Sequence, residues 1–134
     1  MALTSIRAID YMTKNPVTVT PSNSLFEAID IMLTAKVSGA TVINERREVV
    51  GVISEIDCLQ AILKGTYHGE IGGSVADYMT EEVDIIGTDM DILAVAEKLI
   101  QKKRRRMPVV QNGKFIGQYS IRSILNAVKE FNLK

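Results

Sequence analysis

Two stretches with the same layout, Gly51–Leu59 (GVISEIDCL) and Gly117–Leu125 (GQYSIRSIL), decide the fold. Each is an extended apolar run that ends at a serine, Ser54 or Ser120, after which the apolar residues follow helical spacing. The second stretch begins nearly half a chain length after the first, so the sequence is a tandem repeat. The apolar positions of the two predicted helices are Ile56, Leu59 and Ile62 in the first and Ile121, Ile124 and Leu125 in the second.

The first half opens with a well-marked helix. A short helical pattern over 5–12 and a brief β-prone run over 17–20 come before it, and Pro21 ends that run. Ser24 then precedes an amphipathic helix, and Glu27, three residues later, completes a predicted capping box at its start. The apolar stripe of this helix consists of Leu25, Phe26, Ile29, Met32 and Leu33.

A hairpin and a second helix complete the half. β-branched runs at 40–43 and 49–53 flank a polar turn, which is typical of a hairpin. The second helix is predicted to fade by Gly65, and the polar, glycine-containing stretch that follows is predicted to connect the halves. This connector would include Tyr67 and His68, for which we expect surface or packing roles.

The second half repeats this order at a nearly constant offset along the chain. Tyr11-Met12-Thr13 returns as Tyr78-Met79-Thr80, Asp91 takes the helix-cap position, and strands are predicted at 107–110 and 115–119. Each half is therefore predicted to be β-α-β-β-α.

A half of about 60 residues buries too little surface to be stable alone. We therefore expect one α+β domain, 1–134, in which repeat one (about 8–64) and repeat two (about 75–130) pack sheet to sheet with pseudo-twofold symmetry, joined by a connector (about 65–74). This arrangement would create two clefts, each bordered by both halves.

Composition disfavours several classes of function. Lys plus Arg and Asp plus Glu both total 16, so there is no global charge to hold a nucleic-acid backbone or an anionic membrane. Cys58 and His68 are each the only residue of their type, so we expect no disulfide framework and no histidine-based metal site. No apolar run approaches the roughly 18 residues of a membrane span, and the N-terminus lacks a secretory signal pattern. We expect a cytoplasmic protein that is not an enzyme, because no nucleophile–base pair or Walker-type glycine loop is present.

The duplicated halves and the Gly-h-h-Ser-x-x-Asp pattern of Gly51–Asp57, where h is apolar, resemble the cystathionine-β-synthase (CBS) domain pair, also called a Bateman module. The resemblance covers nearly the whole chain. It implies a regulatory module without an obligatory cofactor that binds an adenine nucleotide (AMP, ADP or ATP), forms a homodimer and acts on an unknown regulated protein. Another adenosyl ligand, such as S-adenosylmethionine or NAD, and a ligand-free scaffold are the alternatives.

Ser54 and Asp57 are the first candidate ligand-binding residues. Taken alone, they form a capping box in which Ser54 is the N-cap and Asp57 reaches back to it. The resemblance implies a further role, because free N–H groups at a helix start hold a phosphate and a carboxylate accepts hydrogen bonds from ribose hydroxyls. The resemblance also assigns a polar contact to Thr80 and an adenine slot to Val83, Ile85, Ile86, Met107 and Pro108.

The run Lys102–Arg106 is the only concentrated charge in the chain. Cations at a helix C-terminus complement the helix dipole, which explains its first three residues as solvated charges. By resemblance, Arg105 and Arg106 face the ligand phosphates in the Asp57 cleft, where a guanidinium group gives bidentate contacts. The alternative is that both arginines are solvated too. A nucleic-acid partner would rest on this run alone and is disfavoured, because the run lacks interleaved aromatic residues.

The second cleft departs from the family pattern. Its helix begins with Ser120-Ile121-Arg122-Ser123, so Ser123 replaces the ribose-binding aspartate. A serine hydroxyl binds a diol less well than a carboxylate does. We therefore predict one strong site and one weak, altered or empty one. The residues assigned to the second site are Ser120, Arg122, Ser123, Thr13, and the first-half counterparts of Arg105 and Arg106, Ser38 and Gly39.

Overall fold

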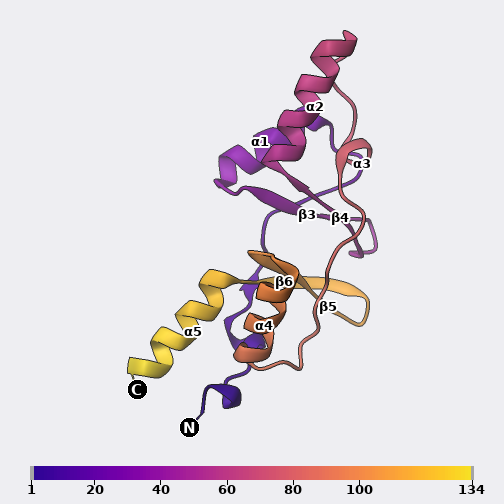
Figure 1. Cartoon of the computed structure of the whole chain (residues 1–134). Helices are drawn as coiled ribbons and strands as arrows, with labels where there is room; N and C mark the ends of the chain where they lie inside the picture. The colour runs from indigo at the N-terminus through magenta and orange to yellow at the C-terminus, as the bar shows by residue number, and fades with distance from the viewer. Residues whose placement is uncertain (1, 134) are drawn as a thin grey trace. The chain divides into compact units, whose positions relative to one another are not determined.

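The computed structural model describes residues 2–133, and the chain divides into two compact units (Figure 1). Unit 1 combines the chain up to Pro16 with the chain from Asp84 onward, and unit 2 is Val17–Val83. Each unit contains one three-stranded sheet together with helices. The predicted α+β class is confirmed.

Unit 2 contains β2 (Thr18–Val19), α1 (Leu25–Ala35), β3 (Gly39–Ile43), β4 (Val49–Ser54), α2 (Glu55–His68) and α3 (Val75–Tyr78). The sheet order is β2-β3-β4, with β2 parallel to β3, and β3 and β4 form the predicted antiparallel hairpin. The capping box predicted for α1 is present, since Glu27 N donates to Ser24 Oγ (3.0 Å) and Ser24 N donates to Glu27 Oε1 (2.7 Å).

Unit 1 contains the 3-10 turns η1 (Leu3–Ser5) and η2 (Ala8–Tyr11), β1 (Thr13–Lys14), α4 (Ile92–Lys102), β5 (Arg106–Gln111), β6 (Lys114–Ser120) and α5 (Ile121–Leu133). The sheet order is β1-β6-β5, and both pairings are antiparallel. The prediction that a strand opens the second half was wrong. Only one residue pairs there, as a parallel bridge between Ile86 and Val109, because glycine and polar residues follow Ile86.

The lead segments of the two repeats, residues 7–16 and 74–83, are exchanged between the units. In unit 1, Thr13 of β1 pairs with β6. In unit 2, Thr80 and Val52 of β4 exchange backbone hydrogen bonds of 2.9 and 3.0 Å. The segment that begins each repeat therefore pairs in the other unit, as the strand β1 in unit 1 and as an isolated bridge at Thr80 in unit 2.

Helix α2 continues beyond its predicted end. Tyr67 and His68 are helical, so the prediction that the helix fades by Gly65 was wrong. Gly65 lies inside the helix. A glycine fits there because the carbonyl of Glu70 approaches so closely that a Cβ would clash with it. The helix ends instead at Gly69, whose left-handed φ of 74° suits glycine.

Helix α1 buries Leu25 and Met32 of its predicted stripe, but α2 buries smaller residues than its predicted stripe contains. Helix α2 turns Cys58, Ala61 and Gly65 toward the core, whereas Ile56 and Leu59 are 66% and 62% exposed. The apolar residues of each helix thus divide between a core face and an outer face. The other large apolar residues on outer faces include Phe26 and Leu33 on α1, Leu93 and Ile100 on α4, and Ile121 and Leu125 on α5. Within residues 2–133, no helix combines the length and the apolar content that crossing a membrane requires.

Candidate ligand-binding site

The start of α2 in unit 2 holds the first pair of predicted site residues. Ser54 Oγ accepts a hydrogen bond from Asp57 N (3.1 Å), and Asp57 Oδ2 accepts one from Ser54 N (2.8 Å). Both residues are half-buried. Asp57 Oδ1 has no hydrogen-bond or ion-pair partner among residues 2–133. The carboxylate therefore caps the helix with one oxygen and leaves the other available.

Thr80, Ser38 and Gly39 lie beside this helix start. Thr80 is exposed, and its backbone pairs with β4 two residues before Ser54. Gly39 pairs with Ser54 across the hairpin, and Ser38 O accepts a hydrogen bond from the first amide of α2 (2.9 Å). Unit 2 thus brings Thr80 to the start of α2, where the first site is predicted. It also brings Ser38 and Gly39 there, although these two residues were assigned to the second site.

The start of α5 in unit 1 repeats the capping arrangement with two serines. Ser120 Oγ accepts a hydrogen bond from Ser123 N (3.0 Å), and Ser123 Oγ accepts one from Ser120 N (2.9 Å). Ser123 Oγ also donates to Ser120 O (2.9 Å). The single hydroxyl proton of Ser123 is used within the cap, whereas Asp57 keeps a free oxygen.

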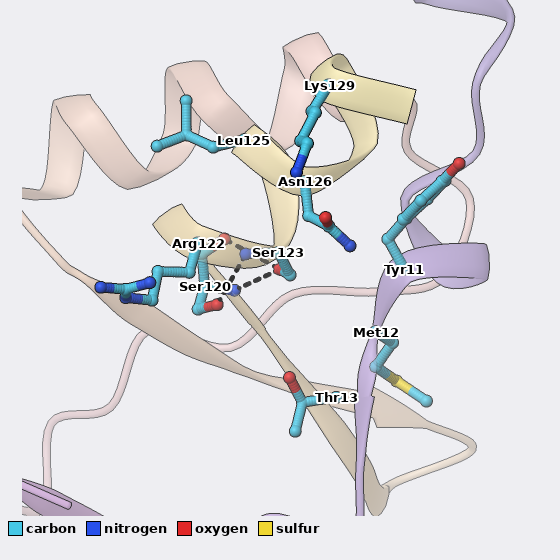
Figure 2. A pocket seen from close by; sticks show the side chains of 9 residues that line it. All are labelled: Tyr11, Met12, Thr13, Ser120, Arg122, Ser123, Leu125, Asn126 and Lys129. Carbon is cyan, nitrogen blue, oxygen red and sulfur yellow. Dashed lines mark hydrogen bonds between the residues drawn. The ribbon is translucent and has the colours of Figure 1, made fainter. Parts of the chain in front are cut away.

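An open pocket of about 900 Å³ lies beside these serines (Figure 2). Two polar residues of its lining, Asn126 and Lys129, were missed by the sequence analysis. They follow Ser123 at three-residue intervals, so Asn126 lies next to Ser123 on the helix surface and Lys129 lies next to Asn126, a spacing that could have identified them. Figure 2 shows Arg122 on one side of the serines and Asn126 and Lys129 on the other. The lining residues are Tyr11, Met12, Thr13, Ser120, Arg122, Ser123, Leu125, Asn126 and Lys129.

Arg105 and Arg106, predicted to contact phosphates, belong to unit 1. Arg106 pairs with Ser120 across β5 and β6, and Arg105 O accepts a hydrogen bond from Ile121 N (2.9 Å). Arg105 is exposed and Arg106 is half-buried. Within their own unit, both arginines therefore lie next to the start of α5.

All three cations that precede these arginines were expected to be solvated charges, but two of them pair with an acidic residue. Lys102 Nζ lies 3.8 Å from Asp84 Oδ1, and Arg104 Nε lies 3.2 Å from Asp84 Oδ2. The pairs are partly exposed, so they contribute about 1 kcal/mol or less to stability. Their contact with Asp84 accounts for two charges of the basic run without a ligand.

Two of the residues assigned to an adenine slot are core residues of unit 1. Ile86 and Met107 are 3% and 0% exposed and belong to one hydrophobic cluster. Pro108 is also buried, and Ile85 is exposed. The apolar character of Ile86 and Met107 is thus explained by the core, and contact with adenine stays a prediction.

Two titratable groups near the helix starts are held neutral. Burial raises the pKa of the Cys58 thiol, and the carboxylates of Asp57 and Glu55 raise it further. The pKa of Tyr11 is raised first by the hydrogen bond that its hydroxyl donates to Glu130 (2.7 Å) and then by burial. Neither group supplies charge at neutral pH. No group of three or more histidine, cysteine and acidic residues that could hold a metal occurs within residues 2–133.

The chain matches the family model of the CBS domain over residues 6–64 and again over 75–130. The zinc metalloprotease MJ0392 of Methanocaldococcus jannaschii is 36% identical over 130 residues, which are 97% of this chain and 34% of that protein. The inosine-5'-monophosphate dehydrogenase of Aquifex aeolicus is 34% identical over 120 residues, which are 88% of this chain and 24% of that protein. The chain therefore spans about a quarter to a third of the length of these relatives.

Solved structures of similar extent share the fold. The crystal structure of CBSX2 in complex with AMP matches with a TM-score of 0.84 and 29% identity, covering 95% of this chain and 98% of that chain. The CBS-pair protein CBSX2 from Arabidopsis thaliana, in a further crystal structure, matches with a TM-score of 0.82 and 28% identity, covering 96% and 98%. With two family matches in one chain and the duplicated fold that they predict, this chain belongs to the CBS domain family as a tandem CBS pair.

Proposed function

We propose that the chain is a regulatory module that binds an adenine nucleotide (AMP, ADP or ATP) at the start of α2 and communicates the presence of the ligand to a partner protein. The observation that carries the proposal is the free Oδ1 of Asp57, which the capping box holds beside the first amides of α2. The proposal is supported by CBSX2, which was crystallised in complex with AMP and is 29% identical in sequence to this chain.

A nucleotide would use two chemical features of this helix start. The first amides of α2 attract a phosphate because they lack helical partners and lie at the positive end of the helix dipole. Asp57 Oδ1 accepts hydrogen bonds from the ribose hydroxyls, and Thr80 adds a polar contact. Occupancy then shifts a conformational equilibrium by no more than the difference in ligand affinity between the two states. The remaining predicted contacts are Arg105 and Arg106 for phosphate and Ile85, Ile86, Met107 and Pro108 for adenine.

Replacing Asp57 with alanine is expected to abolish nucleotide binding, because no other carboxylate in the capping box can take over the ribose contact. The test is a thermal-shift panel of AMP, ADP, ATP, NAD and S-adenosylmethionine. At 100 times Kd, the bound ligand should stabilise the parent protein by about 2.7 kcal/mol and leave Asp57→Ala unchanged.

Glu27→Ala is the matched control for this experiment. It removes the equivalent capping-box contact from α1, so it should cost about 1 kcal/mol of stability and keep the full ligand-induced shift. A shift retained in Asp57→Ala would remove Asp57 from the site. If none of the five ligands shifts the parent protein, the ligand-free scaffold is the better description.

We also propose that two copies associate through the outer faces of the helices. Phe26, Leu33 and Leu59 are exposed on α1 and α2, and Leu33 and Leu59 line an apolar groove of about 270 Å³ between these helices. The matching positions on α4 and α5 are also exposed and apolar, as Leu93, Ile100 and Leu125. A second copy fits best, because the duplication gives every copy apolar faces of the same kind, as a twofold interface requires.

A charge in this groove is expected to convert the dimer to a monomer. Leu33→Glu places a carboxylate where burial would leave it unpaired, which costs several kcal/mol. Light scattering coupled to size exclusion measures the mass, and Tyr67→Glu on exposed Tyr67 is the control that should remain dimeric. A parent protein that is monomeric at all accessible concentrations rules out this interface.

A further inference from the structure

The two helix starts carry opposite charge, although they occupy matching positions in the two units. The first turn of α2 holds two carboxylates, Glu55 and Asp57, and the matching places around the start of α5 hold cations and a serine, but no acidic residue. When Gly51 is aligned with Gly117, the residues Ile56, Asp57 and Leu63 on α2 correspond to Arg122, Ser123 and Lys129 on α5. When Thr13 is aligned with Thr80, the residues Ser38 and Gly39 beside β3 correspond to Arg105 and Arg106 beside β5.

We propose that the pocket at the start of α5 is a polyphosphate site, which binds a chain of two or three phosphate groups and does not require a ribose. No aspartate or glutamate lines this pocket, and both Arg122 and Lys129 do. Neither cation forms an ion pair with a carboxylate among residues 2–133. The cationic charge of the pocket is therefore available to a ligand. The inference rests on the proposed function only in treating the start of α5 as a ligand site.

The acidic residues that adjoin lining residues in the chain do not themselves line this pocket. Asp10 and Glu130 line an adjoining pocket of about 560 Å³ instead. Glu130 is engaged there, since Oε2 accepts the hydrogen bond from the Tyr11 hydroxyl. The two neighbouring pockets thus differ in character, and only the one beside the serines combines cations with a helix start.

The chemistry of Ser123 explains why the ligand would be recognised by phosphate and not by ribose. Its hydroxyl proton is donated to Ser120 O, so it offers a diol no free charge and no free proton. The positive groups lie on both sides of the serines, with Arg122 on one side and Lys129 on the other (Figure 2). A chain of phosphates presents anionic groups to both sides, whereas a monophosphate presents only one.

Pyrophosphate is the probe for this site, because it has neither adenine nor ribose. In isothermal titration of the full chain at fixed ionic strength, Arg122→Gln and Lys129→Gln should each weaken pyrophosphate binding about tenfold, as expected for loss of one charge-assisted contact. Ser123→Asp introduces the carboxylate of the other site and should weaken binding at least as much. The control Lys64→Gln removes a cation from α2, outside the pocket lining, and should leave the affinity unchanged.

The outcomes separate this inference from the proposed function. If the parent protein does not bind pyrophosphate, or if Arg122→Gln and Lys129→Gln bind it as well as the parent does, the polyphosphate site is wrong whatever Asp57→Ala shows. If pyrophosphate binding depends on these cations but no adenine nucleotide binds, the polyphosphate site stands and the adenine-nucleotide proposal fails. Unfolding temperatures of the two cation variants, measured without ligand, should match the parent protein, because Arg122 and Lys129 are exposed.

Discussion

Replacing Gly117 with alanine is expected to lower the free energy of unfolding by about 3 kcal/mol. A Cβ at this position would lie 2.5 Å from Thr13 O and 2.6 Å from Met12 Sδ. The methionine side chain can turn away, but Thr13 O belongs to the backbone of β1, which pairs with β6 at this point. Relief of the clash requires β1 to move out of the sheet, so the substitution costs pairing as well as packing. Denaturant unfolding monitored by circular dichroism measures the loss.

Gly87→Ala is the matched control for this prediction. A Cβ at Gly87 meets no atom within 4 Å. The change should therefore be neutral or stabilise the protein by up to about 1 kcal/mol, because alanine restricts the unfolded chain. If Gly117→Ala is no more destabilising than Gly87→Ala, β1 does not lie against β6 as described.

Replacing Tyr119 with alanine is expected to cost about 3 to 5 kcal/mol, the range for removing a large aromatic side chain from a core. Tyr119 is 0% exposed and packs in the cluster that also contains Ile86, Met107 and Ile124. These residues come from β5, β6, α5 and the bridge beside β5, so the ring joins most of the layers of unit 1. Its removal should leave a cavity that the surrounding strands cannot close.

Tyr119→Phe separates the ring from the hydroxyl. The hydroxyl donates a hydrogen bond to Gly87 O (3.2 Å), so its loss should cost about 1 kcal/mol. Burial raises the pKa of this phenol, so the protonated phenol stabilises the folded state. This contribution to the free energy of unfolding is complete below the ordinary pKa of a tyrosine and is lost as the pH rises through the raised value. Measurements at pH 7 therefore report the neutral side chain. An alanine variant that loses no more stability than the phenylalanine variant would place the ring outside the core.

Local spacing predicted the features that depend on a few neighbouring residues. The capping boxes at Ser24 and Ser54 and the hairpin of unit 2 form as expected, because each depends on residues close together in the chain. The end of α2 was mispredicted because Gly65 was taken as a helix stop. The glycine is needed instead for the close approach of the Glu70 carbonyl, a contact that periodicity does not reveal. The burial of Cys58 in place of Leu59 was not predicted either, because both residues lie within one turn of the helix and the sequence pattern favoured the larger one.

The features of the candidate site that depend on long-range strand pairing could not be predicted from the sequence. Motif spacing identified Ser54 with Asp57 and Ser120 with Ser123, because both pairs are caps that short sequences specify. It did not reveal that Arg106 pairs with Ser120, since a hairpin places those residues opposite each other only through its register. The exchange of lead segments was not predictable either, because the two sheets offer edges of similar sequence and local rules do not choose between them.

Because the lead segments are exchanged, the two repeats depend on each other for strand pairing. A polypeptide with one repeat alone would carry an arm that fits the sheet of a sister molecule, and its own β4 would lack the neighbour that Thr80 supplies here. Two such polypeptides would have to associate for each to pair with the arm of the other. Because one chain here carries both repeats, the exchange takes place within a single molecule and does not depend on protein concentration.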